Sequence, residues 1–222
     1  MPLKPANDPA IDYRALVQRG YDQCAAPYEE ERRNAHHPEL ALLMDRLVDG
    51  AMVLDIGCGS GVPIAQALAQ RHMVTGVDVS HEQIRRARIN VPNGNFLHAD
   101  IMTVDFPVAS FDAVVAFYSI FHLPRESHAP LFQRIHTWLK PAGYLLATVS
   151  QFREAAYTED DFFGVTMYWS NYGVADYHAM LQALGFQFLE TTIIGHGYTD
   201  VHAPAEDHPL VFAQRGAEVM VQ

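Results

Sequence analysis

Three glycines at every second position stand directly after an apolar run in the segment VLDIGCGSG, residues 53–61. They are Gly57, Gly59 and Gly61, and the acid Asp55 lies two residues before the first. Glycine destabilises the interior of a strand or helix, so a cluster of glycines needs a reason. A glycine loop that leads into a helix offers free N–H groups to an anionic group and lets a ligand approach the main chain. The segment therefore predicts a ligand-binding loop.

The spacing of these glycines differs from that of two common phosphate-binding loops. A dinucleotide-binding loop reads G-x-G-x-x-G, whereas here the third glycine comes one residue early and residue 62 is valine. A triphosphate-binding loop needs a Lys-Ser or Lys-Thr pair after its glycines, and the sequence GVPIA contains none. We therefore expect a ligand without a pyrophosphate or triphosphate.

Two further acids follow the next two β-rich runs. Asp78 comes near the end of MVTGVDV, residues 73–79, and Asp100 stands in HADI. An ionised carboxylate accepts hydrogen bonds at both oxygens, so Asp78 is suited to the two hydroxyls of a ribose and Asp100 to an exocyclic amine. A helix cap for Asp78 and a turn for Asp100 are the structural alternatives. Together with the glycine loop, the acids predict a site for a nucleoside that lacks a polyphosphate.

Alternating β-rich and helical runs have to position these residues. The expected strands are 52–56, 73–79, 94–100, 111–119, 144–150, 186–194 and 208–215. The expected helices are 63–71, 81–89, 126–140 and 174–185, with Pro141 and Gly143 ending the third. Such alternation predicts an α/β fold with parallel strands and helices on both faces, in which ligands bind beyond the carboxyl ends of the strands.

The chain length and composition fit one domain, residues 1–222. Residues 1–50 carry helical patterns of their own and are expected to form a cap over the ligand-binding edge, followed by the core in 51–222. The net charge of −11 argues against nucleic acid as a partner. Two isolated cysteines, Cys24 and Cys58, favour a reducing cytoplasm. The first residues contain no apolar signal-peptide region, and no apolar run is long enough for a bilayer, so we expect a soluble cytoplasmic protein with no membrane partner.

The combination of motifs resembles the class I S-adenosylmethionine-dependent methyltransferases of small molecules. The matching segments are VLDIGCGSG, VTGVDVS, FLHADI, FDAVVAFYSIFHL and LKPAGYLLATV, which together cover roughly residues 50–150. The resemblance implies a Rossmann-like, doubly wound sheet of seven mostly parallel strands, the last antiparallel, and S-adenosyl-L-methionine as cofactor. It implies that the backbone of the glycine loop holds the methionyl part of the cofactor. Asp55 is then expected to hydrogen-bond either the loop or the ammonium group of the cofactor. The cofactor contacts it implies are Asp55, Gly57, Cys58, Gly59, Gly61, Asp78, Val79, Asp100, Ile101, Phe117, Tyr118, Tyr21 and Tyr28.

Methyl transfer from a sulfonium is an in-line displacement that depends on alignment and on the exclusion of water. A nucleophile that carries a proton also needs a base, and histidine is the default at neutral pH. The segment FYSIFHLP, residues 117–124, follows the fourth expected strand and brings His122 and Tyr118 towards the methyl group. We expect His122 to act as a base or to contact the substrate, with a structural hydrogen bond in the turn as the alternative.

An aromatic segment, DDFFGVTMYWSNY at residues 160–172, fits neither a helical nor a strand period and is expected to be a loop. This segment belongs to an expected substrate-covering insert, residues 151–173. It predicts that the insert lines a pocket for a small, partly apolar acceptor. The alternative is that these aromatic residues form a small separate core under the loop. The predicted substrate contacts are His122, Phe163, Met167, Tyr168, Trp169 and Tyr172. The segment YDQCAAPYEEER resembles one that small-molecule methyltransferases fold over the cofactor, so Tyr21 and Tyr28 are expected to close the cleft, with Arg32 a weaker candidate, unless the helix only packs.

Twelve histidines raise the possibility of a metal, but the spacing of His196, His202 and His208 matches no compact zinc motif, and we expect none. The preferred function is methylation of a heteroatom or carbon of a small molecule by a monomer or homodimer. Methylation of nucleic acid or protein is less favoured, since AFYSIF replaces the Asn/Asp-Pro-Pro-aromatic segment of amino-methylating enzymes and the chain is short. A non-catalytic protein that binds the cofactor stays as the alternative.

Overall fold

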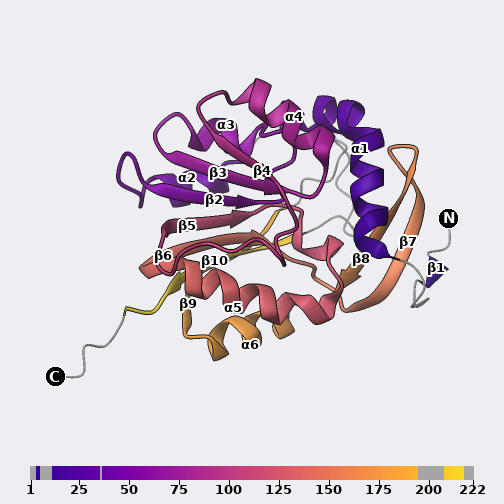
Figure 1. Ribbon diagram of the computed structural model, residues 1–222. Helices are drawn as coiled ribbons and strands as arrows, with labels where there is room; N and C mark the ends of the chain where they lie inside the picture. The colour runs from indigo at the N-terminus through magenta and orange to yellow at the C-terminus, as the bar shows by residue number, and fades with distance from the viewer. Residues whose placement is uncertain (1–3, 6–11, 36, 195–207, 218–222) are drawn as a thin grey trace.

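The computed structural model describes residues 4–5, 12–35, 37–194 and 208–217, and its main body is a seven-stranded sheet between two layers of helices (Figure 1). The strand order is β4-β3-β2-β5-β6-β10-β9. Their bounds are β2 Met52–Ile56, β3 Met73–Asp78, β4 Asn95–His98, β5 Phe111–Ala116, β6 Leu139–Thr148, β9 Phe186–Ile194 and β10 His208–Arg215. β10 pairs antiparallel with both β6 and β9, whereas the pairs from β4 to β6 are parallel. The predicted fold class is confirmed.

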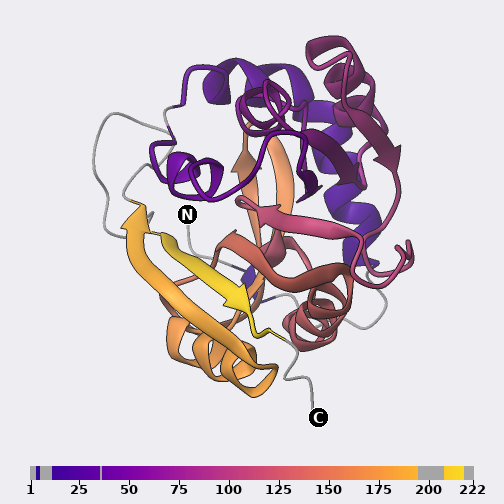
Figure 2. The same ribbon diagram turned by 90° about the vertical axis from the view of Figure 1, so that its left-hand side faces the viewer.

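Helices cover both faces of the sheet because each face carries its own apolar core. One core packs the sheet against α2 Glu39–Met44, α3 Ile64–Leu68 and α4 His81–Asn90. The other packs it against α5 His128–Trp138 and α6 Val174–Ala183. Figure 2 shows the yellow β10 beside the orange β9 at one end of the sheet, with α6 close to them. With both faces covered, a ligand has access to the ends of the strands.

The strand order reverses between β2 and β5, which are neighbours in the sheet although β3 and β4 lie between them in sequence. The carboxyl ends of β2, β3 and β5 point to the same edge, and α1, Tyr13–Arg32, lies across that edge (Figure 1). Two short 3₁₀ helices, η1 Ile120–His122 and η2 Arg125–Ser127, follow β5 there. A crevice at such a reversal is where open α/β sheets bind ligands.

A second sheet supports α1 from outside. It has the order β1-β7-β8, with β1 Lys4–Pro5, β7 Glu154–Phe162 and β8 Val165–Asn171. The prediction of a loop over residues 160–172 was wrong, because β7 and β8 form an antiparallel hairpin there. Irregular register between Glu154 and Tyr157 and again between Glu159 and Phe162 breaks the strict alternation that marks a strand in sequence.

The predicted stop of the third helix also differs from the structure. The helix α5 ends at Trp138, and β6 begins at the next residue, so Pro141 and Gly143 lie inside the strand. The pairing of β5 with β6 is irregular at this point, between Phe111 and Ala113. Proline is tolerated at such irregularities because no ladder hydrogen bond is lost. The other predicted elements are present, with ends that differ by a few residues.

Candidate functional site

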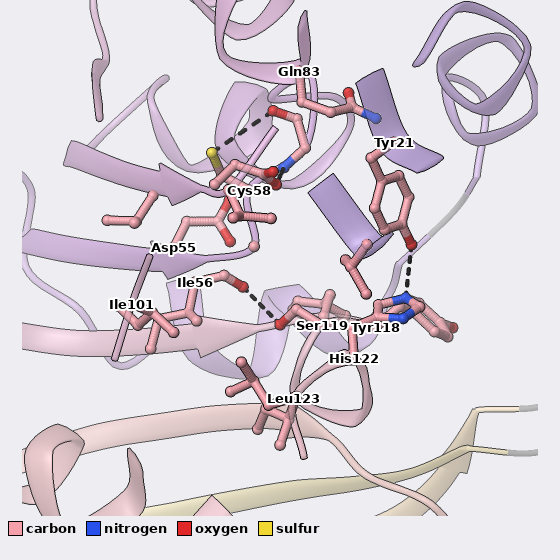
Figure 3. A pocket seen from close by; sticks show the side chains of 18 of the residues that line it. Tyr21, Asp55, Ile56, Cys58, Gln83, Ile101, Tyr118, Ser119, His122 and Leu123 are labelled. Carbon is pink, nitrogen blue, oxygen red and sulfur yellow. Dashed lines mark hydrogen bonds between the residues drawn. The ribbon is translucent and has the colours of Figure 1, made fainter. Parts of the chain in front are cut away.

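A cavity of about 330 Å³ lies at the carboxyl edge of the sheet beneath α1. Its floor is the loop after β2, its sides are the segments after β3, β4 and β5, and its roof is one face of α1. The roof residues recur at helical spacing, which places them in one stripe: Arg14, Val17, Tyr21, Tyr28 and Arg32. Figure 3 shows the side chains that converge on this space from the loop, from α1 and from η1.

The glycine loop forms the floor of the cavity, and the structural requirement for glycine differs among its three glycines. All three have positive φ, a conformation that L side chains rarely adopt. A Cβ on Gly57 would stand 2.3 Å from the Cβ of Ser119, so close packing adds to the requirement there. At Gly59 the nearest atom to such a Cβ is 3.9 Å away, and this residue opens to the cavity.

Gly61, predicted as a cofactor contact, does not line the cavity. A Cβ on it would lie 3.0 Å from Val91 Cγ2 and 3.4 Å from Ala87 Cα, so Gly61 allows the loop to pack closely against α4. The side of Gly61 on which a Cβ would stand faces the neighbouring helix, and its direct contact with the cofactor stays a prediction.

Asp78 stands at the end of β3 with both carboxylate oxygens held by main-chain donors. The N–H of Gly59 donates to Oδ2 at 2.9 Å, and the N–H of Ser80 donates to Oδ1 at 2.8 Å. The cap of α4 is Ser80, so the alternative of a helix cap does not apply to Asp78. Each oxygen keeps a further lone pair for a hydroxyl. Burial raises the pKa of Asp78 to about 6.

Asp55 is buried at the end of β2, and its Oδ2 has no hydrogen-bond partner among the described residues. Burial, together with the charge of Asp78, raises the pKa of Asp55 to about 7. An acid in this state ionises when a cation approaches it. Next to it in the loop, Cys58 is buried and its thiol pKa is raised well above the ordinary value, so it is a neutral wall residue.

Asp100, which is predicted to accept a hydrogen bond from an amine, follows β4 and already interacts with two partners. Its Oδ1 accepts from the N–H of Met102 at 2.9 Å, as in the turn that was the alternative reading. Its Oδ2 lies 3.2 Å from Arg14 Nε, and the Arg14 side chain is 55% exposed. An ion pair this exposed is weak, so Asp100 can exchange Arg14 for a ligand donor. Val79 and Ile101, the neighbours of the two acids, also line the cavity.

The residues after β5 form the wall opposite the acids. Phe117 and Tyr118 line it, and Tyr118 has a φ of 53°. The guanidinium carbon of Arg32 lies 4.1 Å from the Tyr118 ring centroid, a cation–π contact. Burial raises the pKa of the Tyr118 hydroxyl to about 12, so it stays protonated. Ser119 donates from Oγ to the carbonyl of Ile56 at 2.7 Å and fixes the wall to the end of β2.

His122 lies in η1 with both ring nitrogens engaged. Nδ1 lies 2.8 Å from the carbonyl oxygen of Tyr168, which only accepts, so Nδ1 carries the proton. Nε2 is then a bare acceptor, and the hydroxyl of Tyr21 donates to it at 2.8 Å (Figure 3). Burial lowers the pKa of His122 to about 4. The structure thus joins two residues predicted for different tasks into one pair.

The aromatic residues of the hairpin do not line the cavity, and their contact with a substrate stays a prediction. They pack behind the residues that do: the Phe163 ring meets Tyr28, and the Trp169 ring lies 5.5 Å from His122. Met167 and Tyr168 are buried against α1, where a Cβ on Gly20 would stand 2.8 Å from Met167 Cε. Tyr172 lies apart from this group and packs in the core between the sheet and α5 and α6. The hairpin places α1 and supplies the carbonyl that orients His122.

Several polar residues of the cavity lining, among them Arg14 and Gln83, escaped the sequence predictions. Gln83, in the first turn of α4, is fully buried, and neither polar atom of its side chain has a hydrogen-bond partner among the described residues. Its burial depends on α1, which covers the start of α4 through Asp22: the hydroxyl of Ser80 and the N–H of Glu82 both donate to Asp22 Oδ1. Nothing in the local sequence shows this cover.

The histidine-rich segment before β10 falls outside the described residues, except His208, whose ring stacks on Phe121. Among the helices that the structure describes, none combines the length and apolar character that crossing a bilayer requires.

Comparisons with known proteins match the segment that carries this site. Residues 53–143 match a family described as a methyltransferase domain. A curated relative, 27-O-demethylrifamycin SV methyltransferase of Amycolatopsis mediterranei, is 38% identical over 103 residues, which are 43% of this chain and 37% of that protein. The chain spans about half the length of other curated relatives that it matches.

The similarity to solved structures extends over nearly the whole chain. A Burkholderia thailandensis 1,6-didemethyltoxoflavin-N1-methyltransferase, solved with 1,6-didemethyltoxoflavin and S-adenosylhomocysteine, has a TM-score of 0.71 at 21% identity, covering 97% of this chain and 95% of its own. A [4+2]-cyclase, SpnF, has a TM-score of 0.68 at 20% identity, covering 98% of each chain. The fold is therefore shared by proteins of different named activities, and the residues of the site have to decide the reaction.

Proposed function

We propose that this chain is a class I S-adenosylmethionine-dependent methyltransferase, which transfers a methyl group from that cofactor to a heteroatom or carbon of a small, partly apolar molecule. One observation carries the proposal. The segment that matches the methyltransferase domain brings an open glycine loop and acids at three neighbouring strand ends around a single cavity. Fold similarity alone would not distinguish methyl transfer from other reactions.

The residues of the cavity fit the cofactor. Asp78 keeps a lone pair on each oxygen for the ribose hydroxyls, and Asp100 is suited to the adenine amine once Arg14 moves aside. Asp55, with an unpartnered buried oxygen, is suited to the ammonium of the methionyl part above Gly59. When bound, S-adenosylmethionine supplies an activated methyl group whose sulfonium charge disappears on transfer.

For an acceptor that carries a proton, we assign its removal to the Tyr21–His122 pair. Both nitrogens of His122 are engaged, so the acceptor meets the oxygen of Tyr21 rather than the imidazole. The acceptor's proton passes to Tyr21 Oη while the proton of Tyr21 moves to His122 Nε2, which leaves an imidazolium hydrogen-bonded to Tyr168. The pKa of about 4 keeps His122 unprotonated at neutral pH and favours acceptors whose proton is already acidic. Tyr118 stays a predicted catalytic residue that lines the opposite wall.

The apolar walls around Tyr21, Phe117 and Tyr118 support an acceptor that is small and partly apolar. The chain's charge of −11 supports a small molecule rather than a nucleic acid. We extend the proposal to one domain in which residues 1–50 cap the site and 151–173 support that cap, acting as a monomer or homodimer in the cytoplasm.

The test is formation of S-adenosylhomocysteine from S-adenosylmethionine by the purified protein with a panel of small phenols, enols, amines and carboxylic acids. The proposal expects cofactor turnover that depends on one of these classes, with the methylated product identified by mass spectrometry. Tight binding of the cofactor without turnover on any class would favour the non-catalytic alternative. No binding and no turnover would contradict the proposal.

A further inference from the structure

The carboxamide of Gln83 is the only fully buried amide side chain in the cavity wall within the described part of the chain, and both its polar atoms lack partners. Leaving a buried donor and acceptor unpaired is costly, so native structures seldom do it without a reason. The main chain at Gln83 is held in place: its N–H donates to Ser80 Oγ at 3.1 Å, and the Ser80 hydroxyl donates to Asp22. The backbone that carries the amide is thus fixed from two sides.

The amide lies beside the glycine loop, close to the residue that Asp78 holds. Gln83 Oε1 would be 3.9 Å from a Cβ on Gly59, and the N–H of Gly59 donates to Asp78 Oδ2 at 2.9 Å. Gln83 and Asp78 therefore flank the same loop residue at the cavity. Figure 3 shows Gln83 on one side of the segment that carries Cys58 and Asp55 on the other. The two unpartnered groups face different parts of any ligand that lies along the loop.

We propose that the Gln83 carboxamide hydrogen-bonds a ribose hydroxyl of the bound cofactor and forms, with Asp78, a two-sided clamp on the sugar. This rests on the proposed function, which supplies the nucleoside. A carboxylate such as Asp78 only accepts, so each ribose hydroxyl bound to it donates its proton and keeps lone pairs for a donor. The amide N–H of Gln83 is a donor of this kind.

Calorimetric binding of S-adenosylhomocysteine to Gln83→Met tests the assignment, because methionine keeps the length of the side chain and removes both polar atoms. The dissociation constant should rise about tenfold, the loss of one hydrogen bond in a buried site. The melting temperature of the free protein should rise at the same time, because an unpaired buried amide is gone. Gln133→Met, an exposed position on α5, is the matched control and should change neither quantity.

Analogues of S-adenosylhomocysteine that lack the 2′ or the 3′ hydroxyl complete the cycle. Both should bind the wild-type protein more weakly, because each lacks a hydroxyl that donates to Asp78. Only one of them should lose no further affinity in Gln83→Met, because its contact with Gln83 is already absent. The assignment is overturned if Gln83→Met weakens the binding of both analogues by the same factor as it weakens the binding of S-adenosylhomocysteine. It is also overturned if Gln83→Met binds S-adenosylhomocysteine as tightly as the wild-type protein does. If the wild-type protein itself does not bind S-adenosylhomocysteine, the proposed function fails instead, so the two failures are distinguishable.

Discussion

At the scale of single residues, His122 owes its chemical state to two neighbours that are distant in sequence. The carbonyl of Tyr168 fixes the proton on Nδ1, and the hydroxyl of Tyr21 occupies Nε2. Burial keeps the ring neutral. In the proposed reaction, we expect this pair to move a proton in one direction, from the cavity through Tyr21 to the imidazole.

This arrangement predicts the kinetics of two substitutions. His122→Ala and Tyr21→Phe should each lower kcat at least about tenfold, equivalent to about 1.4 kcal/mol in the barrier, with an acceptor that carries a proton. The double variant should be little worse than either single one, because both residues serve one step. The affinity for S-adenosylhomocysteine, measured by calorimetry, should stay within about threefold of wild type. Additive losses in the double variant would show that the two residues act separately.

The raised pKa of Asp55 predicts that its carboxyl group releases a proton when the cofactor binds. Its pKa in the free folded protein, about 7, lies above the ordinary value of 3.8, so folding favours its protonated form. Its contribution to stability is therefore complete at low pH and is lost as the pH rises through about 7. A ligand ammonium favours the ionised form, so affinity should rise between pH 5 and pH 8.

Calorimetry in two buffers of different ionisation enthalpy measures this release directly. At pH 6 the wild-type protein should release close to one proton more than Asp55→Asn, and well above pH 8 the two proteins should release nearly equal numbers. Asp55→Asn is the matched control, because it keeps the shape and removes the titration while Asp78, His122 and the other groups stay. Equal proton release in wild type and Asp55→Asn would contradict the assignment.

The sequence was enough to locate the residues whose positions follow from strand ends. Asp55 and Asp78 come at the ends of apolar runs, and parallel strands bring such ends to one edge. The packing of Gly61 on α4 and the burial of Gln83 could not be predicted, because other parts of the chain, α4 and α1, set these surroundings. Burial of a polar side chain by a distant helix leaves no local pattern.

At the scale of elements, α1 is the part that closes the site. Its inner face lines the cavity, and its outer side packs on the β7–β8 hairpin. Two polar groups tie it to α4: Asp22 accepts from Ser80 and Glu82, and Glu29 binds Arg86 and Asn90. The hairpin behind it could not be predicted as strands, because irregular register interrupts its alternation and acidic residues fill much of β7.

We expect that a weaker attachment of α1 to α4 lowers the affinity for the cofactor, although the residues of the glycine loop stay the same. Asp22→Ala removes the shared acceptor at the start of α4 and should raise the dissociation constant for S-adenosylhomocysteine about five- to tenfold. Limited proteolysis should then cut α1 faster in the free protein than in wild type. Glu30→Ala, an exposed change on the same helix, is the control. An unchanged affinity of Asp22→Ala for S-adenosylhomocysteine would show that the attachment of α1 to α4 does not contribute to cofactor binding.

At the scale of the whole molecule, the sheet supplies a common platform and the additions around it supply the particular site. The seven-stranded, mostly parallel sheet, the helices on both of its faces and the antiparallel last strand were predicted from the alternation of elements and from the family resemblance, because they depend on patterns that run along the chain. The way α1 and the hairpin close over the platform depends on contacts between segments more than a hundred residues apart, such as Tyr21 with His122. We expect these contacts to determine which acceptor reaches the methyl group in the proposed reaction.

The central claim is that a nucleoside lies across the ends of β2, β3 and β4 with its sugar on Asp78. Titration of S-adenosylhomocysteine into wild-type protein and Asp78→Ala by calorimetry tests it most directly. The account predicts one saturable site in wild type and a loss of at least about thirtyfold in affinity in Asp78→Ala, about 2 kcal/mol, because two ribose hydroxyls lose their acceptor. No heat of binding in wild type, or equal affinity in the two proteins, would contradict it.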